Sequence, residues 1–108
     1  MGESFATRRL EIAEDHPAFD GHFPGRPVLP GVALLAAVLE AAAAEPRLAA
    51  CVGEAARLVA VKFLAPVGPG ASLDLSFALG AGSLDWQVSE GERAVARGRI
   101  ACTRDGAA

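Results

Sequence analysis

The run from Val32 to Ala44 constrains the fold most, because these thirteen residues are alanine, leucine and valine with a single charge, Glu40. These residue types have good helix propensity. A helix that is apolar on every side is expected to be buried. Pro46 follows and ends the run. We therefore predict a central helix over 32–44 that the rest of the chain must cover, with an ambiguous alanine-rich connection after it.

The segment before this helix, Asp15 to Pro30, holds four prolines and two glycines in sixteen residues. Such a composition cannot sustain a helix or a central strand, but it can fix one specific loop. Ordered loops of this length are usually functional. The loop also carries His22, whereas His16, which Pro17 follows, is expected to be structural or exposed.

The second half of the chain has the character of short strands separated by turns. Glycine-containing turn signals lie at 68–70, 80–82 and 90–92. Near the N-terminus, charged and apolar residues alternate, which suits a half-buried strand. The expected strands are 7–13, 58–64, 72–79, 84–89 and 94–103. One helix and an antiparallel sheet predict a single α+β domain over residues 1–108, with a curved sheet wrapped around the helix.

Composition bounds the function of the chain. Its 108 residues are 52% hydrophobic but only 6% aromatic, so a second copy of the chain would help to complete the core. A net charge of −3 argues against nucleic-acid binding. We expect neither a signal segment nor a membrane span. Cys51 and Cys102 show no zinc or disulfide spacing, and we interpret them as buried small side chains in a reducing, cytoplasmic compartment.

Two motifs carry a family resemblance. Residues 21–31, GHFPGRPVLPG, and residues 62–70, KFLAPVGPG, occur in the order found in the bacterial 3-hydroxyacyl-[acyl-carrier-protein] dehydratases, which the chain resembles. The resemblance implies a hotdog fold and a homodimer or higher homo-oligomer with an acyl tunnel at the subunit interface. It also implies a thioester of acyl-carrier protein or coenzyme A as ligand, with no cofactor and no metal.

The residues support part of the chemistry that the resemblance implies. His22 is the candidate base, because neutral imidazole has a pKa near 6.5 and accepts a proton at working pH. The first N–H groups of a helix are unpaired and lie at its positive end, so the Gly31 N–H, and that of Val32, would bind the thioester oxygen. The other candidate substrate-binding residues are Phe23, Pro24, Gly25, Pro30 and Ala36.

The catalytic acid of the family is absent. Its place, fourteen residues after His22, holds Ala36. Glu40 lies one helical turn further, about 6 Å along the axis, and is a candidate replacement acid, although a solvent-facing position near the helix end explains it more simply. His22 returning its own proton, or a loop carboxylate such as Asp15 or Asp20, are further alternatives.

Three functions follow from this pattern. The first is a dehydratase-like enzyme acting on acyl thioesters in fatty-acid, lipid or polyketide synthesis. The second is a catalytically silent acyl-thioester-binding hotdog or subunit partner, which Ala36 favours, and the third is a hotdog thioesterase. Arg93, Arg97 and Arg99 would share one face of a regular last strand. That face could dock an acidic carrier protein, but a solvated strand face is the simpler interpretation.

Overall fold

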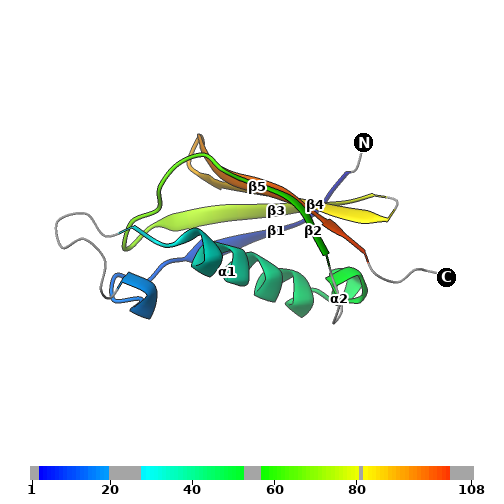
Figure 1. Cartoon of the computed structure of the whole chain (residues 1–108), viewed down its shortest axis with the longest axis horizontal. Coiled ribbons are helices and arrows are strands. Elements are labelled where there is room, and N and C mark those ends of the chain that lie inside the picture. Colours follow the sequence, from blue (N-terminus) through cyan, green and yellow to red (C-terminus); the bar gives the residue numbers. More distant parts are fainter. Residues whose placement is uncertain (1–2, 20–27, 53–56, 81, 103–108) are drawn as a thin grey trace.

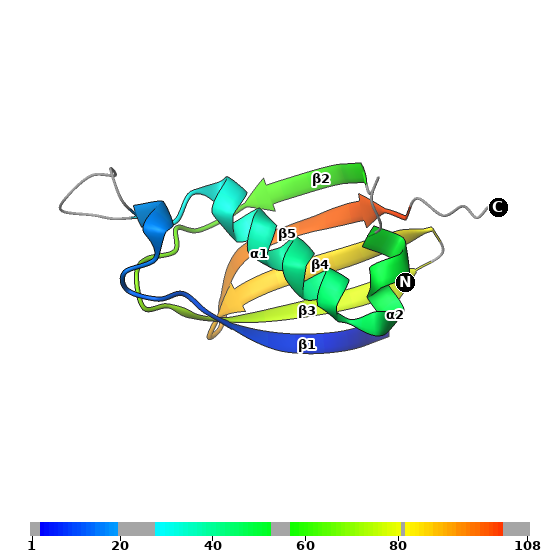
Figure 2. The ribbon, with the colours of Figure 1, turned by 90° about the horizontal axis from the view of Figure 1, so that it is seen from below.

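The computed structural model describes residues 3–19, 28–52, 57–80 and 82–102, and it shows one antiparallel sheet with a long helix lying across it (Figure 1, Figure 2). The elements are β1 (Glu3–Glu11), the 3-10 helix η1 (Pro17–Phe19), α1 (Gly31–Ala44), α2 (Pro46–Val52), β2 (Arg57–Phe63), β3 (Ser72–Gly80), β4 (Ser83–Glu90) and β5 (Arg93–Ala101). The strand order is β1-β3-β4-β5-β2. The predicted α+β class is therefore confirmed. The last four strands lie within two residues of their expected bounds, whereas β1 begins four residues earlier than expected and ends two residues earlier.

The sheet has a buried face toward α1 and a polar face toward solvent. In β3, Leu73, Leu75 and Phe77 are buried, while the residues between them are partly exposed. Successive strand residues point to opposite faces, so this alternation places one apolar layer under the helix. The turns that join β3 to β4 and β4 to β5 contain Gly82 and Gly91, whose φ angles of 79° and 62° suit glycine.

The helix α1 begins and ends almost where the sequence predicts, and the single chain buries one of its faces. Only Leu34, Val38 and Ala42 are buried, at the i, i+4, i+8 spacing of one helix face. Val32, in contrast, is 77% exposed. The sheet of the single chain covers one side of the helix, and the expected cover of the remaining face by a second copy stays a prediction.

The connection after α1 is a second helix. Glu45 leaves the helical conformation, and Pro46 both ends α1 and starts α2. Proline is well suited to the first turn of a helix, where its missing N–H has no partner to lose. Arg8 of β1 forms an ion pair of 3.4 Å with Glu45, which ties this corner to the sheet. No helix in the described part of the chain is long and apolar enough to span a membrane.

The last strand is irregular, which changes the arginine row that the sequence predicts. A register shift lies between Val88 and Ser89 of β4, opposite Val95, and both Val95 and Ala96 are buried. This bulge breaks the alternation. Arg93 therefore does not share a face with Arg97 and Arg99. Its guanidinium contacts the Glu90 carboxylate and the Pro66 carbonyl oxygen, the latter at 3.1 Å.

The two cysteines are joined, so the prediction of free, unpaired thiols is wrong. Cys51 of α2 and Cys102, just after β5, form a disulfide with a Cα–Cα distance of 4.3 Å across 51 residues of sequence. Cysteine spacing carries no sign of this contact, because the fold of α2 onto the end of β5 brings the two residues together.

At Gly98 of β5, the Trp86 indole and the backbone of β2 lie so close that only glycine fits. A Cβ at this position would lie 2.5 Å from Cζ2 of the buried Trp86 and 2.7 Å from the Ala60 carbonyl oxygen. Gly98→Ala should therefore lower the free energy of unfolding by about 1–3 kcal/mol, measured by urea denaturation. Gly80→Ala is the matched control, since its nearest neighbours lie at 3.9 Å. Equal losses in both variants would contradict this view of the indole packing.

The disulfide should contribute strongly to stability, because it closes a long loop in the unfolded chain. Loops of this length imply about 2–4 kcal/mol. Adding reductant should shift the urea midpoint of the wild type downward by the corresponding amount. The double variant Cys51→Ala/Cys102→Ala should unfold at the lower midpoint with or without reductant. A wild-type midpoint insensitive to reductant would rule out the bond.

Candidate functional site

A hollow of about 410 Å³ lies at the N-terminal end of α1, and we call it the α1 hollow. Its walls come from the two sequence motifs, which are more than thirty residues apart. The Leu29 N–H donates a hydrogen bond of 2.7 Å to the Val67 carbonyl oxygen, and this bond joins the motifs directly. The lining residues are Val28, Leu29, Gly31, Leu34, Phe63, Leu64, Ala65, Pro66 and Val67.

The N-terminus of α1 lies beside this hollow and carries backbone N–H groups that have no acceptor among the described residues. Pro30 is the N-cap in extended conformation and provides no side-chain cap, while its carbonyl accepts bonds from Ala33 and Leu34 at 3.0 and 3.2 Å. Within the described residues, the N–H groups of Gly31 and Val32 have no acceptor. The α1 dipole places partial positive charge at this end. The geometry can therefore stabilise a developing negative charge on a carbonyl oxygen.

Phe63 covers Gly31. A Cβ on Gly31 would lie 2.8 Å from Cζ of the Phe63 ring, so a larger residue at the start of the helix would have to displace the ring. The ring is 50% exposed, and Phe63 lines the α1 hollow rather than filling the core. The ring therefore forms part of the wall of the α1 hollow.

The remaining helix candidates share the exposed face of α1. Val32, Ala36 and Glu40 are all exposed and follow one another at intervals of four residues. Glu40 lies nine residues after Gly31, about 13 Å along the axis. The lining of the α1 hollow contains no carboxylate. The described part of this chain therefore offers apolar walls and amide donors there, but no acid.

Four candidates on the loop, His22, Phe23, Pro24 and Gly25, lie outside the described residues, and so does the alternative acid Asp20. Their roles stay predictions. Asp15, the other loop carboxylate, is exposed beside η1. Among the described residues, no three histidine, cysteine, aspartate or glutamate side chains are grouped to hold a metal ion.

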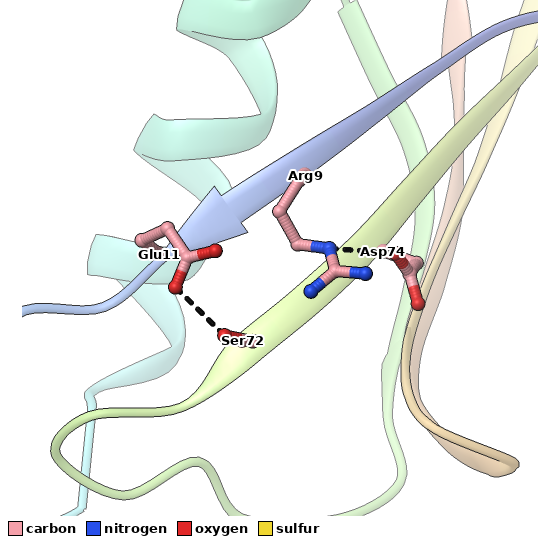
Figure 3. A network of polar contacts seen from close by, with 4 residues as sticks. All are labelled: Arg9, Glu11, Ser72 and Asp74. Carbon is pink, nitrogen blue, oxygen red and sulfur yellow. Dashed lines mark hydrogen bonds and ion pairs between the residues drawn. The ribbon is translucent and has the colours of Figure 1, made fainter.

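Several charged side chains of the sheet, among them Arg9, Asp74, Asp85 and Arg99, lie on the face turned away from α1. Arg9 pairs with Asp74 at 3.0 Å, and the Ser72 hydroxyl donates a bond of 2.7 Å to Glu11 (Figure 3). On the neighbouring strands, Arg99 donates two bonds, of 2.7 and 3.2 Å, to Asp85. These bonds lower the pKa of the Asp85 carboxyl and raise the pKa of the Arg99 guanidinium. The residues that line the α1 hollow, in contrast, carry no charged side chain.

Comparison with known sequences identifies the family. The sequence model of the ApeI-like family, described as ApeI dehydratase, matches residues 2–99. The chain is 30% identical over 99 residues to the 3-hydroxyacyl-[acyl-carrier-protein] dehydratase FabZ of Herpetosiphon aurantiacus, covering 88% of this chain and 64% of the relative. The FabZ of Jannaschia sp. is 33% identical over 98 residues, or 84% and 61% of the two chains. The chain thus spans about half to two thirds of such relatives.

Solved structures agree on the fold. A chain of the dehydratase heterocomplex ApeI:P from Xenorhabdus doucetiae superposes with a TM-score of 0.72 at 23% identity, covering 96% of this chain and 99% of that one. An uncharacterized protein from Erwinia carotovora subsp. atroseptica gives 0.71 at 28% identity, with 95% and 96% covered. The fluoroacetyl-CoA-specific thioesterase FlK, as its F36A mutant, gives 0.57 at 20% identity, with 92% and 82% covered. The chain therefore belongs to the ApeI-like dehydratase family and has the hotdog fold.

Proposed function

We propose that this protein is a 3-hydroxyacyl-thioester dehydratase in which the N-terminus of α1 binds the thioester carbonyl. The observation that carries the proposal is the junction of the two motifs, where the Leu29–Val67 hydrogen bond lies beside an apolar hollow lined by Gly31, whose N–H has no acceptor among the described residues. An acyl chain fits apolar walls, and an enolate-like oxygen fits unpaired amide donors.

The proposed reaction is the reversible loss of water. His22 takes the proton from the carbon next to the thioester carbonyl, and the electron pair forms the carbon–carbon double bond as the hydroxyl leaves the next carbon. The Gly31 N–H, together with that of Val32, stabilises the negative charge on the carbonyl oxygen. The departing hydroxyl needs a proton. Ala36 cannot supply it, and in this proposal the acid comes from elsewhere.

A neighbouring subunit is the proposed source of that acid. Glu40 is too far along α1 to serve the start of its own helix, but it lies on the exposed face beside Ala36. A partner helix packed on this face would meet Glu40. The related heterocomplex ApeI:P contains two kinds of subunit, and a different partner subunit that carries the acid is the second candidate source.

The same absence of a carboxylate favours the second candidate function, a silent thioester-binding hotdog or subunit partner. The two functions differ in turnover and share the ligand, a thioester of acyl-carrier protein or coenzyme A. The thioesterase alternative rests on the fold that the chain shares with FlK, and no described residue that lines the α1 hollow would activate a water. A cytoplasmic location stays a prediction. The disulfide between Cys51 and Cys102 removes the argument for it that rested on unpaired cysteines.

Hydration of a 2-enoyl thioester tests the enzyme proposal, followed by the loss of enoyl-thioester absorbance. Without the family's acid, the wild type should be slower than a complete dehydratase by about 10²- to 10⁴-fold. His22→Ala should abolish the remaining activity, and Ala36→Glu should raise it by restoring a proton donor. Ala43→Glu, which adds the same charge near the other end of the exposed face, should not.

Two results would contradict the enzyme proposal. Equal rates for the wild type and His22→Ala, with both proteins still binding an acylated carrier protein, would contradict dehydration and support the binding function. Acceleration by Ala43→Glu as large as that by Ala36→Glu would contradict the placement of the acid.

We also propose that the chain forms a homodimer through β2. This strand is an edge of the sheet, and its exposed apolar side chains continue into the start of α1. A long apolar edge strand is normally covered, and pairing β2 with its own copy would cover it symmetrically. The exposed apolar residues here are Val28, Val32, Leu58, Val59, Phe63 and Leu64.

Sedimentation equilibrium tests the dimer. The wild type should sediment as a dimer, and Val59→Lys should shift it toward monomer, because a charge on an edge strand opposes pairing. Thr7→Lys is the matched control, since Thr7 is exposed on β1, the opposite edge of the sheet. Monomeric wild type, or equal dissociation of both variants, would contradict pairing through β2.

A further inference from the structure

The face of the sheet turned away from α1 has a second hollow, of about 530 Å³, which we call the outer-face hollow. It lies over β2, β5 and β4, and the side chains that project into it alternate with the buried Trp86 and Ile100. It is therefore separated from the α1 hollow by the thickness of the sheet. Its lining residues are Val59, Ala60, Val61, Lys62, Asp85, Trp86, Gln87, Arg97, Gly98 and Arg99.

The strand register explains why this face is hollowed. Arg99 stands between Ala60 on β2 and Asp85 on β4. Its guanidinium makes two hydrogen bonds to Asp85, which draws the long side chain toward β4. Ala60 has only a methyl group to fill the space on the other side. The space above β2 and β5 therefore stays open.

The next row across the same strands concentrates positive charge. Lys62 on β2 is directly opposite Arg97 on β5, and Arg97 is opposite Gln87 on β4. Like charges directly opposite one another destabilise a sheet. Arg99 is neutralised by Asp85, whereas neither Lys62 nor Arg97 has a carboxylate partner in the described part of the chain. This local excess stands out in a chain whose net charge is −3.

We propose that the outer-face hollow binds the phosphate group of a small phosphorylated molecule, with Lys62 and Arg97 as its charged contacts and the Gln87 amide as a further donor. Guanidinium and ammonium groups are the side chains that bind phosphate best. The volume lies in the range of small-molecule sites. Two unpaired cations side by side match one phosphate group better than the broad surface that an acidic protein would need. The proposal does not depend on the chemistry assigned to α1.

Phosphate binding should be visible in the stability of the intact protein. Inorganic phosphate should raise the thermal unfolding midpoint above that in sodium chloride of equal ionic strength, because the anion relieves the repulsion between Lys62 and Arg97. Lys62→Gln and Arg97→Gln should each weaken phosphate binding by about tenfold. Each variant should also unfold no earlier than the wild type in chloride, since one member of the like-charged pair is gone.

The matched control is Arg9→Gln. Arg9 lies on the same face of the sheet but is paired with Asp74, away from the hollow. This variant should keep the phosphate affinity of the wild type. Equal phosphate affinity in the wild type, Lys62→Gln and Arg97→Gln, or an equal effect of chloride, would overturn the proposal.

Calorimetric titration with coenzyme A, pantetheine and inorganic phosphate distinguishes the sources of the phosphate. Coenzyme A that binds more tightly than inorganic phosphate and depends on Lys62 would identify the nucleotide end of a thioester carrier as the ligand. Coenzyme A no tighter than inorganic phosphate would identify a free phosphate site. Pantetheine, which lacks phosphate, should not bind there. An acyl-carrier protein that binds this face and is not displaced by phosphate would overturn the proposal in favour of protein docking.

Discussion

Burial of one face of α1 against the sheet is the constraint on which the rest of the structure depends. Leu34, Val38 and Ala42 pack on the apolar layer of the strands, and this packing fixes the direction of the helix. The free N-terminus of α1 is then held at the end of β2, next to Phe63. The opposite face of α1 is exposed in the single chain, so the same packing positions the candidate site and the surface on which the proposed partner packs.

The two faces of the sheet have separate electrostatic roles. The face under α1 is apolar, and the α1 hollow relies on backbone amides and the helix dipole rather than on side-chain charge. The outer face carries the ion pairs Arg9–Asp74 and Arg99–Asp85. These pairs involve Asp74 and Asp85, and Lys62 and Arg97 have no carboxylate partner in the described part of the chain, so they are left as a local excess of positive charge. One sheet can thus present an apolar and an anion-binding surface without mixing them.

Ala36 stands where the resemblance places the family's catalytic acid. The source of the proton for the leaving hydroxyl is therefore the open question about this chain. In the proposed function, the Gly31 N–H is a backbone donor, and such donors survive changes of side chain, so an oxyanion site can persist in a chain with alanine at the position of the family's acid. A general acid is a side chain and can be lost by one substitution. Ala36 and Glu40 both lie on the exposed face of α1, where the proposal has a second subunit pack.

The sequence by itself determined the helix, the five strands, the glycine turns and the two motifs, because residue spacing and turn chemistry act within each element. Only the tertiary structure decided which distant groups meet. Leu29 bonds to Val67, Cys51 joins Cys102, and the bulge at Val95 removes Arg93 from its row. Such contacts depend on strand order and register, which a local pattern does not encode. The apolar composition of α1 likewise does not encode which of its faces the sheet covers, and the structure shows that this face is that of Leu34, Val38 and Ala42.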